Sequence, residues 1–242
     1  MKTSIYFAVN LIIIAYLLCI NGCNSVIEPK IGETLTDVDG NVYHTVTIAS
    51  QTWMTENLRC THYNDNTPIQ VVLDSASWEN CNYGAICWYE NDSTNYSGKF
   101  GALYNWYAVS RGLLAPKGWH VATSNDWLTL ENNVSSYISS SKTLSKILAS
   151  QTGWSQSLNQ GTTGNNSSIN NSSLFSALPA GVRINYYQSY SKKDSLGAWW
   201  TSTLSDTIRF AIGMSIGYNQ TYVDRRAYSK WSGFSVRCVK DN

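Results

Sequence analysis

Alternating apolar and polar residues predict that the first part of the chain forms β structure. The alternation extends over Thr34–Leu58 and is interrupted at Asp39-Gly40. An Asp-Gly pair favours a tight hairpin turn because glycine accepts the positive φ that the turn requires. In the strand after this turn, alternate residues from Val42 to Ile48 share one face, and those between them share the other.

Helical spacing is found in the middle of the chain. Thr123 is a good N-cap residue, Asp126 follows it at capping-box spacing, and Trp127, Leu128 and Leu130 then repeat at helical spacing. A second stripe predicts a helix over Lys142–Ala149. The range Leu103–Val109 fits either a helix or a strand, and we favour a short helix.

The other apolar runs are short and predict strands. Two polar segments separate them: residues 60–82 predict a long loop, and residues 155–173, rich in Ser, Asn, Gly and Thr, predict an exposed loop or insertion. The predicted strands are Ala85–Tyr89, Gly118–Val121, Phe175–Leu178, Ala198–Thr203, Thr207–Ile216, Thr221–Asp224 and Gly233–Val239.

The N-terminus has the pattern of an export signal. Lys2 precedes an apolar run, Ile5–Ile20, that is too short to span a bilayer. Ile20 and Gly22 lie at the outer positions of a lipobox before Cys23, although Asn21 fits the middle position poorly. We expect residues 1–22 to be removed and Cys23 to carry lipid. The alternative is an ordinary signal cut elsewhere, which would leave Cys23 as a structural cysteine.

The overall charge argues against binding to nucleic acid. Loss of Lys2 with the signal leaves 16 basic and 16 acidic residues, and charged residues make up only 14% of the chain. Such a balance gives no electrostatic hold on nucleic acid or on phospholipid headgroups. A mature chain of this size can bury a core as one domain.

The cysteines are consistent with export. Cys60, Cys81, Cys87 and Cys238 remain after Cys19 and Cys23 are set aside. An even number in an oxidising compartment predicts two disulfides, with three possible connectivities. A zinc site competes with this interpretation, but the chain has no C-x2-C spacing and its histidines are scattered.

Several motifs, in order along the chain, resemble the Fibrobacter succinogenes major paralogous domain, a family common in bacterial lipoproteins. They cover nearly all of residues 33–241. The matching segments are DVDGNVYHTV (37–46), QTWMTENLR (51–59), GAICWY (84–89), GALYNWYAV (101–109), PKGWHVAT (116–123), FSALPAGVR (175–183), AWWTST (198–203) and GFSVRCVKD (233–241). The family often has cysteine where this chain has Ala115, so the resemblance implies that Cys87 or Cys60 replaces the usual partner of Cys238.

This family is similar to formylglycine-generating enzymes and to the C-type lectin-like fold. The resemblance implies an α+β fold in which two helices pack on a twisted, mostly antiparallel sheet, with the terminal strands adjacent and long loops carrying any site. Those enzymes hold copper with a cysteine pair upstream of the GFSVRC-like strand. Residues 208–231 contain no cysteine, so we expect neither that chemistry nor any other cofactor. The tripeptides by which C-type lectins hold calcium are also absent, so no metal ligand is assigned.

The aromatic residues raise a carbohydrate hypothesis, because Trp and Tyr faces stack on sugar rings. The chain has 10 Trp and 16 Tyr. The tryptophans inside the motifs, Trp53, Trp88, Trp106, Trp119, Trp127, Trp199 and Trp200, are predicted to be structural. Loop residues are the better ligand candidates, and solvated loop residues are the alternative interpretation. The candidates are Tyr218, Asn219, Tyr222, Arg225, Arg226 and Tyr228, which we favour slightly, and Tyr186, Tyr187 and Tyr190.

The sequence thus predicts a lipid-anchored, non-catalytic binding module at the cell envelope, with the outer membrane as the expected location, that recognises a glycan or a protein through C-terminal loops. Residues 1–22 are the signal, 23–32 the lipidated cysteine and tether, and 33–242 the domain. Two other classes remain open: a structural subunit of the envelope or of a surface appendage, and an enzyme on the same scaffold.

Overall fold

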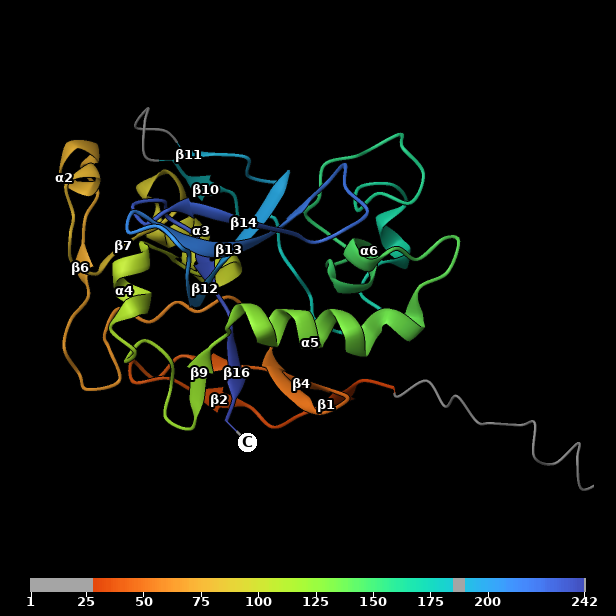
Figure 1. Ribbon diagram of the computed structural model, residues 1–242, viewed down its shortest axis with the longest axis horizontal. Coiled ribbons are helices and arrows are strands. Elements are labelled where there is room, and N and C mark those ends of the chain that lie inside the picture. The colour runs from red at the N-terminus through yellow and green to blue at the C-terminus, as the bar shows by residue number, and fades with distance from the viewer. Residues whose placement is uncertain (1–27, 185–189, 242) are drawn as a thin grey trace, which may run out of the picture.

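The computed structural model describes residues 28–184 and 190–241 and has an α+β fold. Two larger sheets lie on either side of helix α5 (Ser124–Val134), which packs against strands of both (Figure 1). The predicted class, α+β with mostly antiparallel strands, is confirmed. The predicted signal peptide and Cys23 lie outside the described residues.

The first sheet joins the two ends of the fold. Its order is β1 (Lys30–Ile31), β4 (Thr45–Ile48), β5 (Gln51–Met54), β16 (Cys238–Lys240) and β9 (Trp119–Val121), and every pairing is antiparallel. The last strand therefore lies inside the sheet, beside a strand from the beginning of the chain. This adjacency agrees with the expectation for the terminal strands.

The second sheet is formed by the C-terminal part of the chain. Its order is β14 (Asp224–Ser229), β13 (Phe210–Gly217), β12 (Leu196–Leu204) and β15 (Ser235–Val236), and only β15 runs parallel to its neighbour. Strands were predicted for most of this region, but Phe175–Leu178 forms only an isolated bridge, Ala149 with Ala177.

Three small sheets complete the β structure of the described residues. The first pairs β2 (Leu35–Thr36) with β3 (Val42–Tyr43). In the second, β7 (Ala85–Cys87) lies between β6 (Gln70–Val71) and β8 (Leu103–Tyr104). The third pairs β10 (Val182–Arg183) with β11 (Tyr190–Ser191). The strand is interrupted at His44, between β3 and β4. Tyr43 is buried, whereas Val42 and His44 are exposed.

The predicted helix that begins after Thr123 and the predicted helix at 142–149 are present as α5 and α6 (Leu144–Leu148). Thr123 and Asp126 form the expected capping box. Besides the two helices that the resemblance implied, the described residues contain three short ones, and the last of them begins within Leu103–Val109, where a short helix was favoured. These are α2 (Ser75–Glu79), α3 (Ser93–Phe100) and α4 (Trp106–Ser110); 3-10 turns occur at Tyr89–Asn91, Ser135–Tyr137 and Ser167–Ile169.

Aromatic residues form much of the core, as predicted. Trp53 and Trp127 meet edge to face with ring centroids 5.5 Å apart, and Phe175 contacts both rings. Trp200 stacks on Phe234 in a second cluster, at 4.5 Å. Such contacts bury large apolar areas in specific geometries.

The prediction of two disulfides was wrong: all four described cysteines are free and buried. The thiol of Cys60 donates to the carbonyl of Leu114 at 3.7 Å, and the thiol of Cys81 donates to that of Ser77 at 3.1 Å. Burial raises the pKa of Cys60 to about 12 and also raises the pKa values of Cys87 and Cys238. These cysteines act as small apolar core residues rather than as cross-links.

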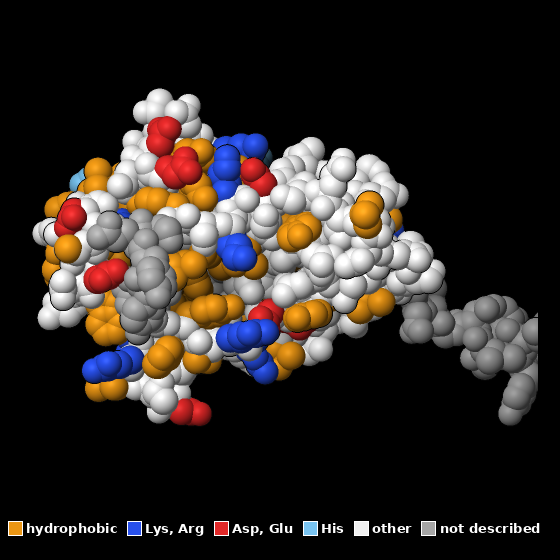
Figure 2. Space-filling view, turned by 90° about the horizontal axis from the view of Figure 1, so that it is seen from above, with side chains coloured by type: hydrophobic (Ala, Val, Ile, Leu, Met, Phe, Trp, Pro, Cys, Tyr) orange, Lys and Arg blue, Asp and Glu red, His pale blue; other side chains and the backbone are white. Residues whose placement is uncertain are grey.

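Residues 155–173 were predicted to be exposed, but part of this loop is buried. Gly161, Thr162 and Thr163 are buried, and Lys146 from α6, only 1% exposed, reaches into the loop. Its ammonium donates to the carbonyls of Thr162, Asn165 and Asn166. On the face shown in Figure 2, this end of the molecule presents almost no charged side chains.

Within the described part of the chain, helices are too short or too polar to cross a bilayer.

Candidate functional site

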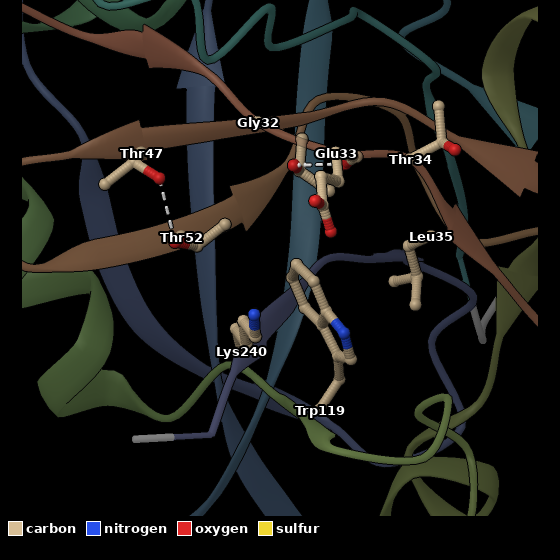
Figure 3. Close-up of a pocket in the computed structure, with 9 residues that line it drawn as sticks. Gly32, Glu33, Thr34, Leu35, Thr47, Thr52, Trp119 and Lys240 are labelled. Carbon is tan, nitrogen blue, oxygen red and sulfur yellow. Dashed lines mark hydrogen bonds between the residues drawn. The ribbon is translucent and has the colours of Figure 1, made fainter.

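A polar pocket of about 410 Å³ lies on the outer face of the first sheet, away from α5 (Figure 3). We call it the threonine pocket. Threonines of β4 and β5 form its floor, the segment before and into β2 forms its roof, and Trp119 and Lys240 form a wall. Its lining residues are Gly32, Glu33, Thr34, Leu35, Thr45, Thr47, Thr52, Trp119 and Lys240.

The floor follows from the alternation along β4 and β5. Val46 and Trp53 face each other in register and belong to the core cluster that contains Trp127 of α5. Their neighbours Thr47 and Thr52 therefore face outward, and their hydroxyls lie 2.9 Å apart. The result is a surface of hydroxyl groups that can donate and accept hydrogen bonds.

Two hydrogen bonds with Thr45 fix the position of the roof segment. The amide of Gly32 donates to the carbonyl of Thr45 at 2.9 Å, and the hydroxyl of Thr45 donates to the carbonyl of Glu33 at 2.6 Å. A Cβ at Gly32 would lie 2.3 Å from that hydroxyl oxygen. Glycine is therefore required where the roof approaches the floor.

The wall contributes an aromatic ring and a cation. Trp119 and Lys240 are register partners in β9 and β16, and Trp119 is half-buried. Glu33 projects from the roof toward the Trp119 ring, and Leu35 and Lys240 lie on opposite sides of that ring (Figure 3). Neither Glu33 nor Lys240 forms an ion pair with any described residue. The pocket thus combines hydroxyls, an indole and two unpaired charges of opposite sign.

A smaller pocket of about 210 Å³ lies next to it on the α5 side and includes His120. The His120 ring bridges two carboxylates, with Nδ1 2.7 Å from Asp241 and Nε2 3.1 Å from Asp126. Desolvation lowers the pKa of His120, but the hydrogen bonds and charges of Asp241 and Asp126 outweigh it, so the pKa is raised overall. This arrangement connects the first turn of α5 to the end of β16.

The candidate residues Tyr218 and Asn219 serve the scaffold. Tyr218 is half-buried against the α5 core, and its carbonyl accepts from the amide of Gly164 at 2.7 Å. The side-chain oxygen of Asn219 accepts from Ser157 at 2.7 Å and from Asn159 at 2.8 Å. Both residues tie residues 155–165 to the loop after β13.

The remaining C-terminal candidates do not converge on one point. Tyr222 is 48% exposed, and Arg225 is exposed on β14. Arg226 pairs with Asp224 at 2.6 Å, and the Tyr228 ring packs edge to face on Phe234 at 4.9 Å. None of them lines the threonine pocket.

Tyr190 belongs to a third region. Its hydroxyl donates to Asn91, and its ring lies 5.4 Å from that of Tyr89. Burial raises the pKa of Tyr190, as do the charge and hydrogen bond of Cys87. Tyr186 and Tyr187 lie outside the described residues.

Sequence reasoning missed the threonine pocket. Trp119 was assigned to the structural tryptophans, yet it is one of the half-buried ones and faces a polar cavity. The signal in the sequence was the threonine alternation on the polar face of residues 45–52. Its meaning depends on where residues 32–35 and 240 lie, which only the fold supplies.

No group of three or more His, Cys, Asp or Glu side chains is placed to hold a metal within residues 28–184 and 190–241. Comparison with curated proteins and with solved structures gives no significant match. The Fibrobacter succinogenes major domain matches residues 46–240. That range covers most of the chain and includes most of the strands and all the helices described above. The chain therefore belongs to the Fibrobacter succinogenes major domain family.

Proposed function

We propose that this protein is a non-catalytic, lipid-anchored binding module of the cell envelope that recognises a glycan through the threonine pocket. The observation that carries the proposal is the combination of the Trp119 ring with outward hydroxyls and unpaired charges in one cavity. This site replaces the C-terminal loops as the preferred location, because the loop candidates are dispersed or occupied in scaffold contacts.

A glycan suits this set of groups better than an apolar ligand does. An indole stacks on the C–H face of a sugar ring, while hydroxyls and charged groups bond to the ring's own hydroxyls. The volume of about 410 Å³ falls within the range of small-molecule sites. Its lining is mostly polar, however, which favours a hydrated, hydroxyl-rich ligand.

The tether would keep this pocket close to the membrane. The 9 residues from Asn24 to Gly32 span at most about 30 Å when fully extended. A lipid on Cys23 would therefore hold the pocket near the membrane surface. Acyl chains hold a protein there because each buried methylene contributes about 0.8 kcal/mol.

The binding test is a glycan array probed with the wild-type protein and with paired variants. Trp119→Ala and Thr47→Val should each lower binding of any recognised glycan at least 10-fold, because they remove the stacking ring or a floor hydroxyl. Tyr222→Ala with Arg225→Ala is the matched control on the C-terminal surface, and it should bind as wild type does. Loss of binding in the control alone would return the site to the C-terminal loops, and binding unaffected in all variants would refute the pocket.

The anchoring test is separate. Cys23→Ser should move the protein from the membrane fraction to the aqueous fraction and should remove the mass of the acyl chains from the mature protein. A variant that stays in the membrane fraction, with an unchanged N-terminal mass, would contradict lipidation at this residue.

A further inference from the structure

The C-terminal sheet ends in a strand that has no partner on its outer side. Strand β14 pairs only with β13, and it forms one edge of the four-stranded sheet (Figure 1). Arg225, Arg226 and Ala227 are exposed along it.

The phase of the β13–β14 ladder identifies which backbone groups face outward. The amide of Lys230 donates to the carbonyl of Arg209 at 3.1 Å, and the register continues without a shift to Ser215 and Asp224. Hydrogen-bonded pairs alternate along an antiparallel ladder. Arg225, Ala227 and Ser229 therefore direct their amides and carbonyls away from β13.

These outward groups are almost all unused. The carbonyl of Ser229 accepts from the amide of Ser232 at 2.8 Å. Among the described residues, no other hydrogen bond involves the outward backbone groups of Arg225, Ala227 or Ser229. An open row of this kind is a template for pairing with another strand.

For pairing with a second copy of the same strand, the side chains favour one register. In an antiparallel pairing centred on Ala227, Arg225 faces Ser229 of the second copy, and Arg226 faces Tyr228. Asp224, which pairs with Arg226 of its own strand, then comes opposite Lys230, a buried residue whose ammonium lies over the Trp106 ring, so these two residues form no new ion pair between the copies. The neighbouring register centred on Arg226 would place two arginines face to face, which is unfavourable. The Ala227-centred register thus avoids a directly opposed pair of arginines.

The flanking surface supports the same partner. Ile208 and Phe210, 89% and 40% exposed, lie at the end of the β12–β13 hairpin, beside the Ser229 end of β14. In the Ala227-centred pairing this end meets the Arg225 end of the second copy, where Tyr222 is exposed. A two-fold axis would therefore bring exposed apolar side chains of each copy toward those of the other.

We propose that two copies of this protein associate through β14, in antiparallel register about Ala227, to form one continuous eight-stranded sheet. The count follows from joining two sheets of four strands each. The interface is isologous, because the same strand serves both copies. It uses Tyr222, Arg225 and Arg226 as assembly residues rather than as a glycan site, so it is independent of the threonine pocket.

Cysteine cross-linking of the full-length protein in cells tests the pairing. Facing hydrogen-bonded residues have Cα atoms about 5.5 Å apart, which lies within disulfide range. Ala227→Cys should give a disulfide-linked dimer under mild oxidation. Val71→Cys, 50% exposed on the edge strand β6, is the matched control and should stay monomeric. Arg226→Cys should also fail to link, because Arg226 faces Tyr228 rather than itself.

A second variant tests the backbone bonds without relying on cross-linking. Ala227→Pro removes an outward amide, so it should convert the dimer to a monomer in sedimentation velocity while the thermal unfolding midpoint of the monomer stays near that of wild type. The proposal is overturned if Ala227→Cys gives no linked dimer, if Val71→Cys links equally well, or if Ala227→Pro remains dimeric.

Discussion

Three buried cations among the described residues, Lys146, Arg183 and Arg237, donate to backbone carbonyls instead of carboxylates. Arg237, fully buried, donates to the carbonyls of Met54 at 3.0 Å, Phe175 at 2.7 Å and Ser176 at 2.9 Å, and to the side-chain oxygen of Asn57 at 2.9 Å. Desolvation lowers the pKa of Arg237 to about 9, which still leaves it charged at neutral pH. Arg237 therefore joins the first sheet to the segment that precedes β10.

Replacing Arg237 should strongly destabilise the fold. Arg237→Leu would leave the three buried carbonyls without this donor, and we expect a loss of about 3–5 kcal/mol in the free energy of unfolding. Urea denaturation followed by tryptophan fluorescence measures this loss. Arg209→Leu, at an exposed arginine, should change the midpoint little. Equal effects of the two substitutions would contradict the role assigned to Arg237.

Residue roles were predicted well where burial decides them. Trp53, Trp127, Trp199 and Trp200 are in the core, as their places inside the family motifs implied. The role of Trp119 was not predictable, because its ring faces residues from the two ends of the fold. Local spacing carries no information about such partners.

At the level of elements, the start of α5 is connected to the end of β16 through His120. Because the pKa of His120 is raised above 6.5 in the folded protein, the protonated ring stabilises the fold. This contribution is fully present below the unfolded pKa and is lost as the pH rises through the folded pKa. It therefore disappears from about pH 6.5 upward.

Comparison of His120→Gln with the wild type measures this contribution. The wild type should have the higher urea midpoint below pH 6, and the difference should shrink as the pH is raised toward 8. When both proteins carry Asp241→Asn, the difference between their urea midpoints below pH 6 should also become smaller, because the variant removes one of the two carboxylates that contact the His120 ring. A difference that grows with pH would have the wrong sign for a raised histidine pKa.

Helix α6 anchors residues 155–173 through Lys146. Lys146→Met should release this loop, because three carbonyls lose their donor, and proteolysis within residues 156–168 should become at least 10-fold faster. Lys142→Met, two residues before the start of the same helix and half-buried, is the control and should be cut at the wild-type rate. Mass spectrometry of the fragments locates the cuts.

The elements that the sequence predicted are those with strong local signals. Helix α5 has a capping box and an apolar stripe, and β12 and β13 are long. Strands such as β6 and β8 contain two residues each and depend on their partners, so no periodicity could reveal them. The burial of residues 161–163 was unpredictable for the same reason: it depends on Lys146, which lies outside the loop.

At the level of the whole molecule, four thiols replace the expected disulfides. Alkylation of the denatured protein without reductant should modify Cys60, Cys81, Cys87 and Cys238, whereas the native protein should react slowly because all four are buried. Intact-mass measurement counts the modified sites. Modification that requires a reductant would show that cross-links form after all.

The threonine pocket is built from the two extremities of the folded chain, with Gly32 and Glu33 contributed at one end and Lys240 at the other. A bound molecule would bridge these extremities, and fraying of either would destroy its site. Ligand binding would thus be coupled to global unfolding rather than to the motion of one loop. Above the dissociation constant, each tenfold increase in ligand concentration would add about 1.4 kcal/mol to the free energy of unfolding. In a screen of diverse compounds, a raised melting temperature would then report any compound that occupies the pocket, whatever its chemistry.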